Sequence, residues 1–207
     1  MFRGDQLVDT PRGPARVDLD PSGTGPPVSL LVLGHGAGGG VDAPDLIALR
    51  DQATSAGVAV ARVTQPYRVA GRRAPAPANH LDESWMAVVA ALLPRLPGVP
   101  LVVGGRSSGA RVACRTAAAV GAAGIVALAF PLHPPGRPER SRAAELLSGV
   151  PTLVLNGDRD PFGMPPAGTD VEVVSRPGER HDLRVDPAGT AALALGWLRE
   201  RGWARPS

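Results

Sequence analysis

The sequence has no lysine, a single cysteine and few aromatic residues. All basic side chains among its 207 residues are arginines, and the aromatic residues make up 3% of the chain. The lone thiol, Cys114, excludes an internal disulfide, and its Ala-rich surroundings predict a buried, inert side chain. The net charge is only +3 and the arginines are scattered. The chain therefore lacks a basic stripe with interleaved aromatic residues, which is the pattern that would indicate nucleic-acid binding.

Long apolar runs are missing as well. No segment reaches the roughly 20 apolar residues that a membrane span requires. Charged residues, Arg3 and Asp5, stand where a signal peptide would begin its apolar run. We therefore expect a cytoplasmic protein without membrane contact. A chain of this length fits one domain, and we expect a single core over residues 1–207.

Short apolar runs rich in β-branched residues recur along the chain and predict strands at 28–33, 58–63, 99–103, 124–130, 152–155 and 171–174. Helices are predicted between them, at 43–55, 81–93, 108–120, 142–147 and 187–201. Because strands and helices alternate and the strands are almost continuously apolar, we expect an α/β fold with a mostly parallel sheet covered by helices on both faces. Residues 6–8 and 15–20 are expected to add one or two antiparallel strands at an edge.

The strongest chemical signal is a G-x-S-x-G pattern between a predicted strand and a predicted helix, at residues 105–109. A serine on such a tight turn needs small residues two positions before and after it. Glycines meet this need for Ser107, whereas Ser108 has Arg106 and Ala110 at the corresponding positions. The pattern therefore predicts Ser107 as a nucleophile beside a helix N-terminus, which favours negative charge on a substrate oxygen.

A serine nucleophile needs a base, and the base needs an acid that orients it. In the fold where this motif occurs, the acid and then the histidine follow the serine along the chain. Of the four histidines, only His181 follows every plausible acid. Asp160 fits the usual G-x-x-D-P spacing after a strand. Asp158 is the alternative acid, with a turn-stabilising role as its other interpretation, and Asp182 is a weaker candidate because it adjoins the histidine.

The glycine-rich segment 34–40 follows the first apolar strand and should complete an oxyanion hole. An N–H group there, that of Ala37 or Gly38, would pair with the N–H of Ser108. The same segment also matches G-x-G-x-x-G, which is typical of dinucleotide-binding oxidoreductases. Against a dinucleotide-binding oxidoreductase, no Asp or Glu ends the next strand, although an arginine could serve the 2′-phosphate of NADP. That interpretation also leaves the serine, aspartate and histidine unexplained.

At these residues the chain resembles the α/β-hydrolases, and more closely their dienelactone-hydrolase-like branch, over nearly its whole length. The resemblance implies a single domain without a cap. Residues 65–73 and 131–136 are similar to a smaller subfamily that includes a testis-expressed protein and a subunit of a chromatin-modifying complex. That subfamily implies a hydrolase fold with a poorly defined substrate, and some members are scaffolds. Because Ser107 replaces the cysteine of dienelactone hydrolases, dienelactone is not expected as the substrate.

The resulting hypothesis is a serine hydrolase that cleaves a small ester or thioester and needs neither a metal nor an organic cofactor. The alternative is a non-catalytic binding or scaffold protein of the same fold.

Two long loops, 64–80 and 131–141, should line the ligand crevice. If the first folds over Ser107, its arginines and a neighbour of the serine are candidates for binding a substrate carboxylate or phosphate: Arg68, Arg72, Arg73 and Arg106. The other interpretation of that loop is a solvated basic segment. His133 is a candidate for substrate contact or for holding its own Pro-rich loop.

Overall fold

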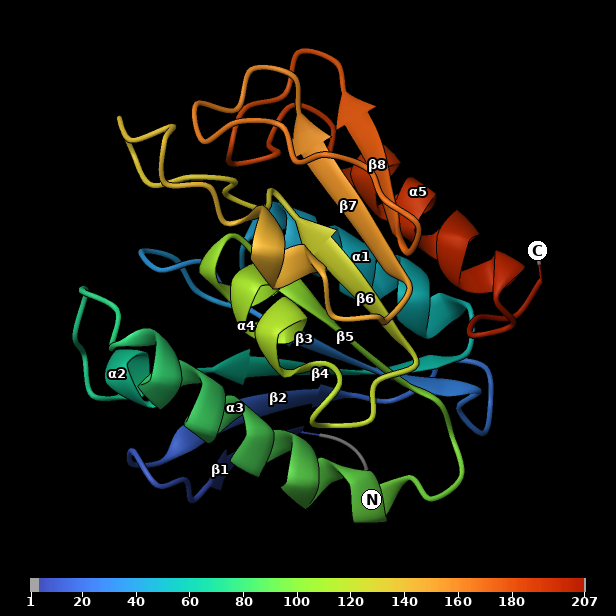
Figure 1. The fold of residues 1–207 in the computed structure, drawn as a ribbon. Helices are drawn as coiled ribbons and strands as arrows, with labels where there is room; N and C mark the ends of the chain where they lie inside the picture. Colours follow the sequence, from blue (N-terminus) through green and yellow to red (C-terminus); the bar gives the residue numbers. More distant parts are fainter. Residues whose placement is uncertain (1–3, 207) are drawn as a thin grey trace.

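The structure is a computed structural model that describes residues 4–206. Within this range one sheet of eight strands has the order β1-β2-β4-β3-β5-β6-β7-β8 (Figure 1). Strands β3 to β8 are parallel, and β1 and β2 join them as an antiparallel edge. All six predicted strands and the antiparallel edge are therefore confirmed. The strands are β1 Gly4–Val8, β2 Ala15–Asp20, β3 Ser29–Gly34, β4 Val58–Thr64, β5 Leu101–Arg106, β6 Gly124–Leu128, β7 Thr152–Gly157 and β8 Val171–Arg176.

Helices cover both faces of the sheet, as expected. Side chains of α3 and α4 share one buried apolar cluster, and those of α1 and α5 share the other (Figure 1). The α-helices are α1 Pro44–Ser55, α2 Pro66–Val69, α3 Ala78–Leu92, α4 Ser108–Thr116 and α5 Pro187–Glu200, and two short 3₁₀ helices are η1 Leu93–Arg95 and η2 Ala143–Leu146.

Two predicted helices and one predicted loop need correction. The helix predicted at 108–120 ends at Thr116, and the one predicted at 142–147 is the 3₁₀ turn η2. The loop 64–80 was expected to lack secondary structure, but it contains α2 and the first residues of α3. A four-residue helix is too short to show an apolar periodicity, so the sequence pattern could not reveal α2.

The core lies on both sides of the sheet because alternate residues of a strand point to opposite faces. In β3, Leu30 and Val32 belong to the cluster under α3 and α4, whereas Leu31 and Leu33 belong to the cluster under α1 and α5. Cys114 lies in the first cluster, where burial raises the pKa of its thiol to about 12. The thiol therefore stays protonated and chemically quiet, as its surroundings in the sequence predicted.

Three glycines allow β3, β5 and α4 to meet closely where β5 ends. A Cβ atom on Gly109 would lie 2.4 Å from the carbonyl carbon and oxygen of Gly34, and a Cβ on Gly105 would lie 2.4 Å from the same oxygen. Gly105 also has a φ of 150°, which L side chains rarely adopt. The two glycines of G-x-S-x-G are thus required by backbone contact with the first parallel strand.

Replacing Gly109 by alanine is expected to destabilise the protein by about 3 kcal/mol, since backbone atoms on both sides must move to admit the methyl group. Gly196 is the matched control, because it is also a helical glycine but a Cβ there meets open space. Gly196→Ala is expected to stabilise by about 0.5–1 kcal/mol. Urea unfolding of the two variants measures both values, and similar midpoints would contradict the close packing.

Candidate active site

Ser107 lies on a sharp turn between β5 and α4. Its backbone has φ 53° and ψ −109°, a conformation that costs energy for a residue with a side chain and is typical of functional sites. The N–H of Ser107 donates to the carbonyl of Leu128 at 2.9 Å, which ties the turn to the end of β6. The turn places the hydroxyl at the carboxyl edge of the sheet.

The structure brings together the serine, histidine and aspartate that the sequence singled out. The Nε2 atom of His181 lies 2.8 Å from Oγ of Ser107, and its Nδ1 atom lies 2.8 Å from Oδ2 of Asp160. A carboxylate beside Nδ1 favours the tautomer with its proton on that atom. Nε2 is then free to accept the proton of the serine hydroxyl.

The carboxylate of Asp160 is fixed by its surroundings. Its side chain is 1% exposed, and Oδ1 accepts a hydrogen bond from the N–H of Phe162 at 2.8 Å. The Phe162 ring packs edge-on against His181, with ring centroids 4.3 Å apart. Asp158 is directed elsewhere, because its Oδ1 accepts from the N–H of Gly178 at 2.8 Å. Of the two alternative acids, Asp160 is therefore the one that contacts the histidine.

Two buried polar residues that the sequence did not identify hold the loops of the site. Glu179 is 1% exposed and accepts hydrogen bonds from the N–H groups of Val185 and Asp186, at 3.1 and 2.6 Å. Asn156 is fully buried in β7 and accepts from the N–H of Phe130 at 2.7 Å. An asparagine within an apolar strand is a signal that sequence reading could have used, whereas a glutamate in a polar loop gives none.

The glycine-rich loop after β3 lies directly against the nucleophile. A Cβ atom on Gly36 would be 3.5 Å from Cβ of Ser107. Within residues 4–206, the N–H groups of Ala37, Gly38 and Ser108 donate no hydrogen bond to another residue. Unused donors beside a nucleophile are what an oxyanion hole requires.

The same glycines do not form the start of a dinucleotide site. In such sites the G-x-G-x-x-G segment opens a helix, but α1 begins only at Pro44, beyond Gly39. Gly34 is instead needed for the contact with α4. The geometry thus accounts for the pattern without a nucleotide.

His35 fastens the glycine-rich loop to the segment after β4. Its Nε2 accepts from the N–H of Gln65 at 3.1 Å, so this nitrogen carries no proton, and Nδ1–H donates to the carbonyl of Gly36 at 2.8 Å. Tyr67 adds a second tie, since its hydroxyl donates to the carbonyl of Ala37 at 2.8 Å. Burial lowers the pKa of His35, because it disfavours the charged ring.

A stability loss at mildly acidic pH is expected from His35. In the unfolded chain, His35 takes up a proton as the pH falls below its ordinary pKa of 6.5. In the folded protein the pKa of His35 is lower, so the ring takes up the proton only at a lower pH. Nearby Arg68 lowers this pKa further and Asp42 opposes it. The contribution of His35 to the free energy of unfolding is therefore complete above pH 6.5. It falls as the pH decreases toward the lowered pKa of His35 in the folded protein.

The variant His35→Gln tests this expectation, since glutamine cannot titrate. Its Tm is expected to fall less steeply between about pH 6.5 and 5 than that of the wild type. The two proteins share all other titratable groups, so the difference between their curves isolates His35. Parallel curves would show that His35 does not resist protonation in the folded protein.

Arg106, a candidate for substrate binding, has two protein partners in the structure. Its Nε lies 3.2 Å from Oδ2 of Asp45, whose carboxylate is completely buried, and its Nη2 donates to the carbonyl of His181 at 3.2 Å. Burial raises the pKa of Asp45 to about 6, while the guanidinium opposes that rise. Only 14% of the Arg106 side chain is exposed. The guanidinium therefore joins α1 to the loop of the histidine.

The other candidates for substrate binding have different surroundings. Arg68 and Arg72 line two separate hollows, neither of which includes Ser107 or His181. The Nδ1 atom of His133 lies 3.0 Å from the carbonyl of Pro134, and its backbone N–H donates to the carbonyl of Phe162 at 3.2 Å. The structure thus brings none of the three into contact with the candidate nucleophile.

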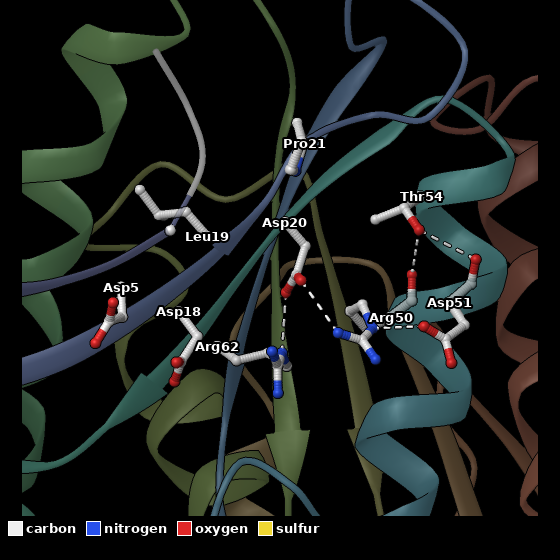
Figure 2. A pocket seen from close by; sticks show the side chains of 10 residues that line it. Asp5, Asp18, Leu19, Asp20, Pro21, Arg50, Asp51, Thr54 and Arg62 are labelled. Atoms are coloured by element: carbon white, nitrogen blue, oxygen red, sulfur yellow. Dashed lines mark hydrogen bonds and ion pairs between the residues drawn. The ribbon is translucent and has the colours of Figure 1, made fainter.

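A further hollow of about 600 Å³ lies at the antiparallel edge, between β2 and α1 (Figure 2). Figure 2 shows the guanidinium groups of Arg50 and Arg62 directed toward Asp20, with N–O distances of 3.1 and 3.0 Å. Three more aspartates line it, but residues 4–206 contain no group of three or more His, Cys, Asp or Glu side chains that could hold a metal ion. The hollow is remote from the triad in the fold and carries no catalytic geometry.

Comparison with known proteins identifies the family of this chain. The model of the family described as alpha/beta hydrolase domain matches residues 27–177, which include Ser107 and Asp160 but end before His181. No curated protein is significantly similar to the chain. In the part that the structure describes, no helix is long and apolar enough to cross a membrane.

Solved structures of the same fold cover almost the whole chain. An α/β serine hydrolase without a lid from Xanthomonas campestris is 20% identical, with a TM-score of 0.76, over 99% of this chain and 96% of the other. An α/β serine hydrolase homologue from Coxiella burnetii has 18% identity and a TM-score of 0.81, over 96% and 98%. The esterase domain of a Rhodothermus marinus protein has 14% identity and a TM-score of 0.73, over 97% and 99%. The predicted α/β-hydrolase fold without a cap is thereby confirmed, whereas the closer resemblance to the dienelactone-hydrolase-like branch stays a prediction.

Proposed function

Because this chain belongs to the alpha/beta hydrolase domain family, we propose that it is a serine hydrolase that cleaves a carboxylic ester or thioester through an acyl-enzyme on Ser107. The observation that carries the proposal is the continuous chain of hydrogen bonds from Ser107 through His181 to Asp160. Its place on a strained turn at the carboxyl edge of the sheet adds support, as does the occurrence of serine hydrolases and an esterase domain among structures of this fold.

In the proposed reaction, His181 accepts the hydroxyl proton through Nε2 while Oγ of Ser107 attacks the carbonyl carbon. Asp160 stabilises the imidazolium that forms. The carbonyl oxygen becomes negatively charged and accepts hydrogen bonds from the N–H groups of Ser108 and of Ala37 or Gly38. His181 then gives its proton to the leaving alcohol or thiol, and an acyl group remains on the serine.

The second half of the reaction repeats these roles with water. His181 takes a proton from a water molecule, whose oxygen attacks the acyl carbon and forms a second oxyanion. Collapse of this intermediate breaks the bond to Oγ of Ser107, and the serine recovers its proton from the imidazolium. The products are a carboxylic acid and an alcohol or thiol, and the protein returns to its starting state.

Hydrolysis of 4-nitrophenyl butyrate and of the matching thioester tests the proposal. We expect release of the leaving group with both, and an initial burst when deacylation is slower than acylation. His181→Ala should lose turnover, because no other group takes the serine proton. If neither compound is hydrolysed and a protein partner co-purifies in a fixed ratio, the chain is a non-catalytic binding protein of this fold.

A further inference from the structure

Unpaired arginines gather at one edge of the molecule. Most guanidinium groups in residues 4–206 take part in an ion pair or donate to a carbonyl or amide oxygen. Those in the described chain without a side-chain partner are Arg72, Arg73, Arg137, Arg140, Arg159 and Arg180. All of them lie in the segments that follow the carboxyl ends of the parallel strands β4, β6, β7 and β8. This is the edge that carries the triad.

Arg159 and Arg180 are the two unpaired arginines next to the catalytic groups. Each immediately precedes a member of the triad, Asp160 and His181. Both residues line a hollow of about 430 Å³ whose lining also includes His181. A negatively charged part of a ligand in this hollow would lie beside the base of the proposed reaction.

The backbone holds these two arginines on one rim. The N–H of Arg159 donates to the carbonyl of Glu179 at 3.0 Å, which joins the loop after β7 to the loop after β8. The loops meet so closely that a Cβ atom on Gly157 would lie 2.2 Å from the carbonyl oxygen of Glu179 and 2.9 Å from that of Arg180. Two arginines whose backbones are held next to each other, and whose guanidinium groups have no other partner in the described chain, are suited to binding one anion together.

The acidic groups nearby do not cancel this charge. Asp182 is the only acid among the residues that line the hollow, and its Oδ2 lies 3.6 Å from Nε of Arg184. Asp158 and Asp160 face other partners, the N–H of Gly178 and the imidazole of His181. The hollow therefore keeps an excess of positive charge at its rim.

We infer that Arg159 and Arg180 form a specificity site for an anionic group, a carboxylate or a phosphate, carried by the substrate close to its scissile ester. The inference rests on the proposed function and names the substrate class of the same site. It moves anion recognition from Arg68, Arg72 and Arg106 to two residues that the sequence did not single out. The arginine neighbours of the triad would then select the ester, while the triad cleaves it.

The experiment compares kcat/KM for a neutral ester and two anionic ones. The neutral compound is 4-nitrophenyl butyrate. Mono-4-nitrophenyl glutarate carries a carboxylate on its acyl side, and 3-butyryloxy-4-nitrobenzoate carries one on its leaving group. At low salt, the wild type is expected to prefer at least one anionic ester by about tenfold. The anionic ester that is preferred shows which side of the scissile bond faces the arginines.

The double variant Arg159→Gln/Arg180→Gln is expected to lose this preference. Each result is a ratio of two substrates with one preparation, so a changed active fraction cancels. Arg201→Gln is the matched control, because it removes one positive charge beyond the far end of α5 and should keep the wild-type ratio. Inhibition by free glutarate and by inorganic phosphate then distinguishes a carboxylate site from a phosphate site.

Two outcomes would overturn the inference. One is a wild type that does not prefer either anionic ester, and the other is a preference that the double variant retains. Neither outcome affects the proposed function, which fails only if the neutral ester also remains unhydrolysed.

Discussion

Replacing Ser107 by alanine is expected to lower kcat/KM for an activated ester by a factor of about 10⁴ or more. The Oγ atom that His181 contacts at 2.8 Å is the group that would form the acyl bond in the proposed reaction. Without it, the remaining groups orient water poorly. Steady-state hydrolysis of 4-nitrophenyl butyrate measures the effect, with the circular dichroism spectrum as a check on folding.

Ser108→Ala is the matched control for this prediction. Alanine keeps the backbone N–H proposed for the oxyanion hole and removes only a hydroxyl, while the hydroxyl bonded to His181 is that of Ser107. We expect kcat/KM to change by no more than about threefold. An equal loss in both variants would mean that the adjacent serines do not have separate roles, and the assignment of the nucleophile would be wrong.

Replacing Asp160 by asparagine is expected to lower kcat by a factor of about 10³–10⁴, because an amide at this position favours the wrong tautomer of His181. The fold should persist, since the N–H of Phe162 can still donate to the amide oxygen of the new side chain. The loss should therefore lie in kcat, with little change in the free energy of unfolding. Kinetics and urea unfolding of the same preparation separate the two effects.

Asp158→Asn is the control for the acid. Its oxygen accepts a hydrogen bond from Gly178 in a turn, and asparagine can accept the same bond. Activity is expected to stay within about threefold of the wild type. A large loss in Asp158→Asn with little change in Asp160→Asn would reverse the roles of the two aspartates.

The parts of the fold that could be predicted from the sequence depend on local patterns. Nearly continuous apolar runs identified the parallel strands, because a strand covered on both faces holds few polar residues; β3 and β4 contain only Ser29, Arg62 and Thr64. The glycines around Ser107 could be interpreted because a backbone contact leaves no room for a side chain. Chain order then limited the choice of histidine to His181.

The parts that could not be predicted depend on contacts between distant segments. Whether Arg106 is free or engaged is decided by Asp45, which lies some sixty positions earlier in the chain. Arg159 and Arg180 have no distinctive spacing, and only the pairing of β7 with β8 brings them to one rim. Sequence pattern thus pointed to the serine, histidine and aspartate that the structure brings together, but it could not show which arginines have a partner.

The most direct test of the account is where a fluorophosphonate probe attaches. The probe forms a covalent bond only with an activated serine, and peptide mapping by mass spectrometry identifies the labelled residue. We predict a single adduct on Ser107 that is retained in Ser108→Ala and absent from Ser107→Ala and His181→Ala. An adduct on another serine, or none in the wild type, would contradict the account.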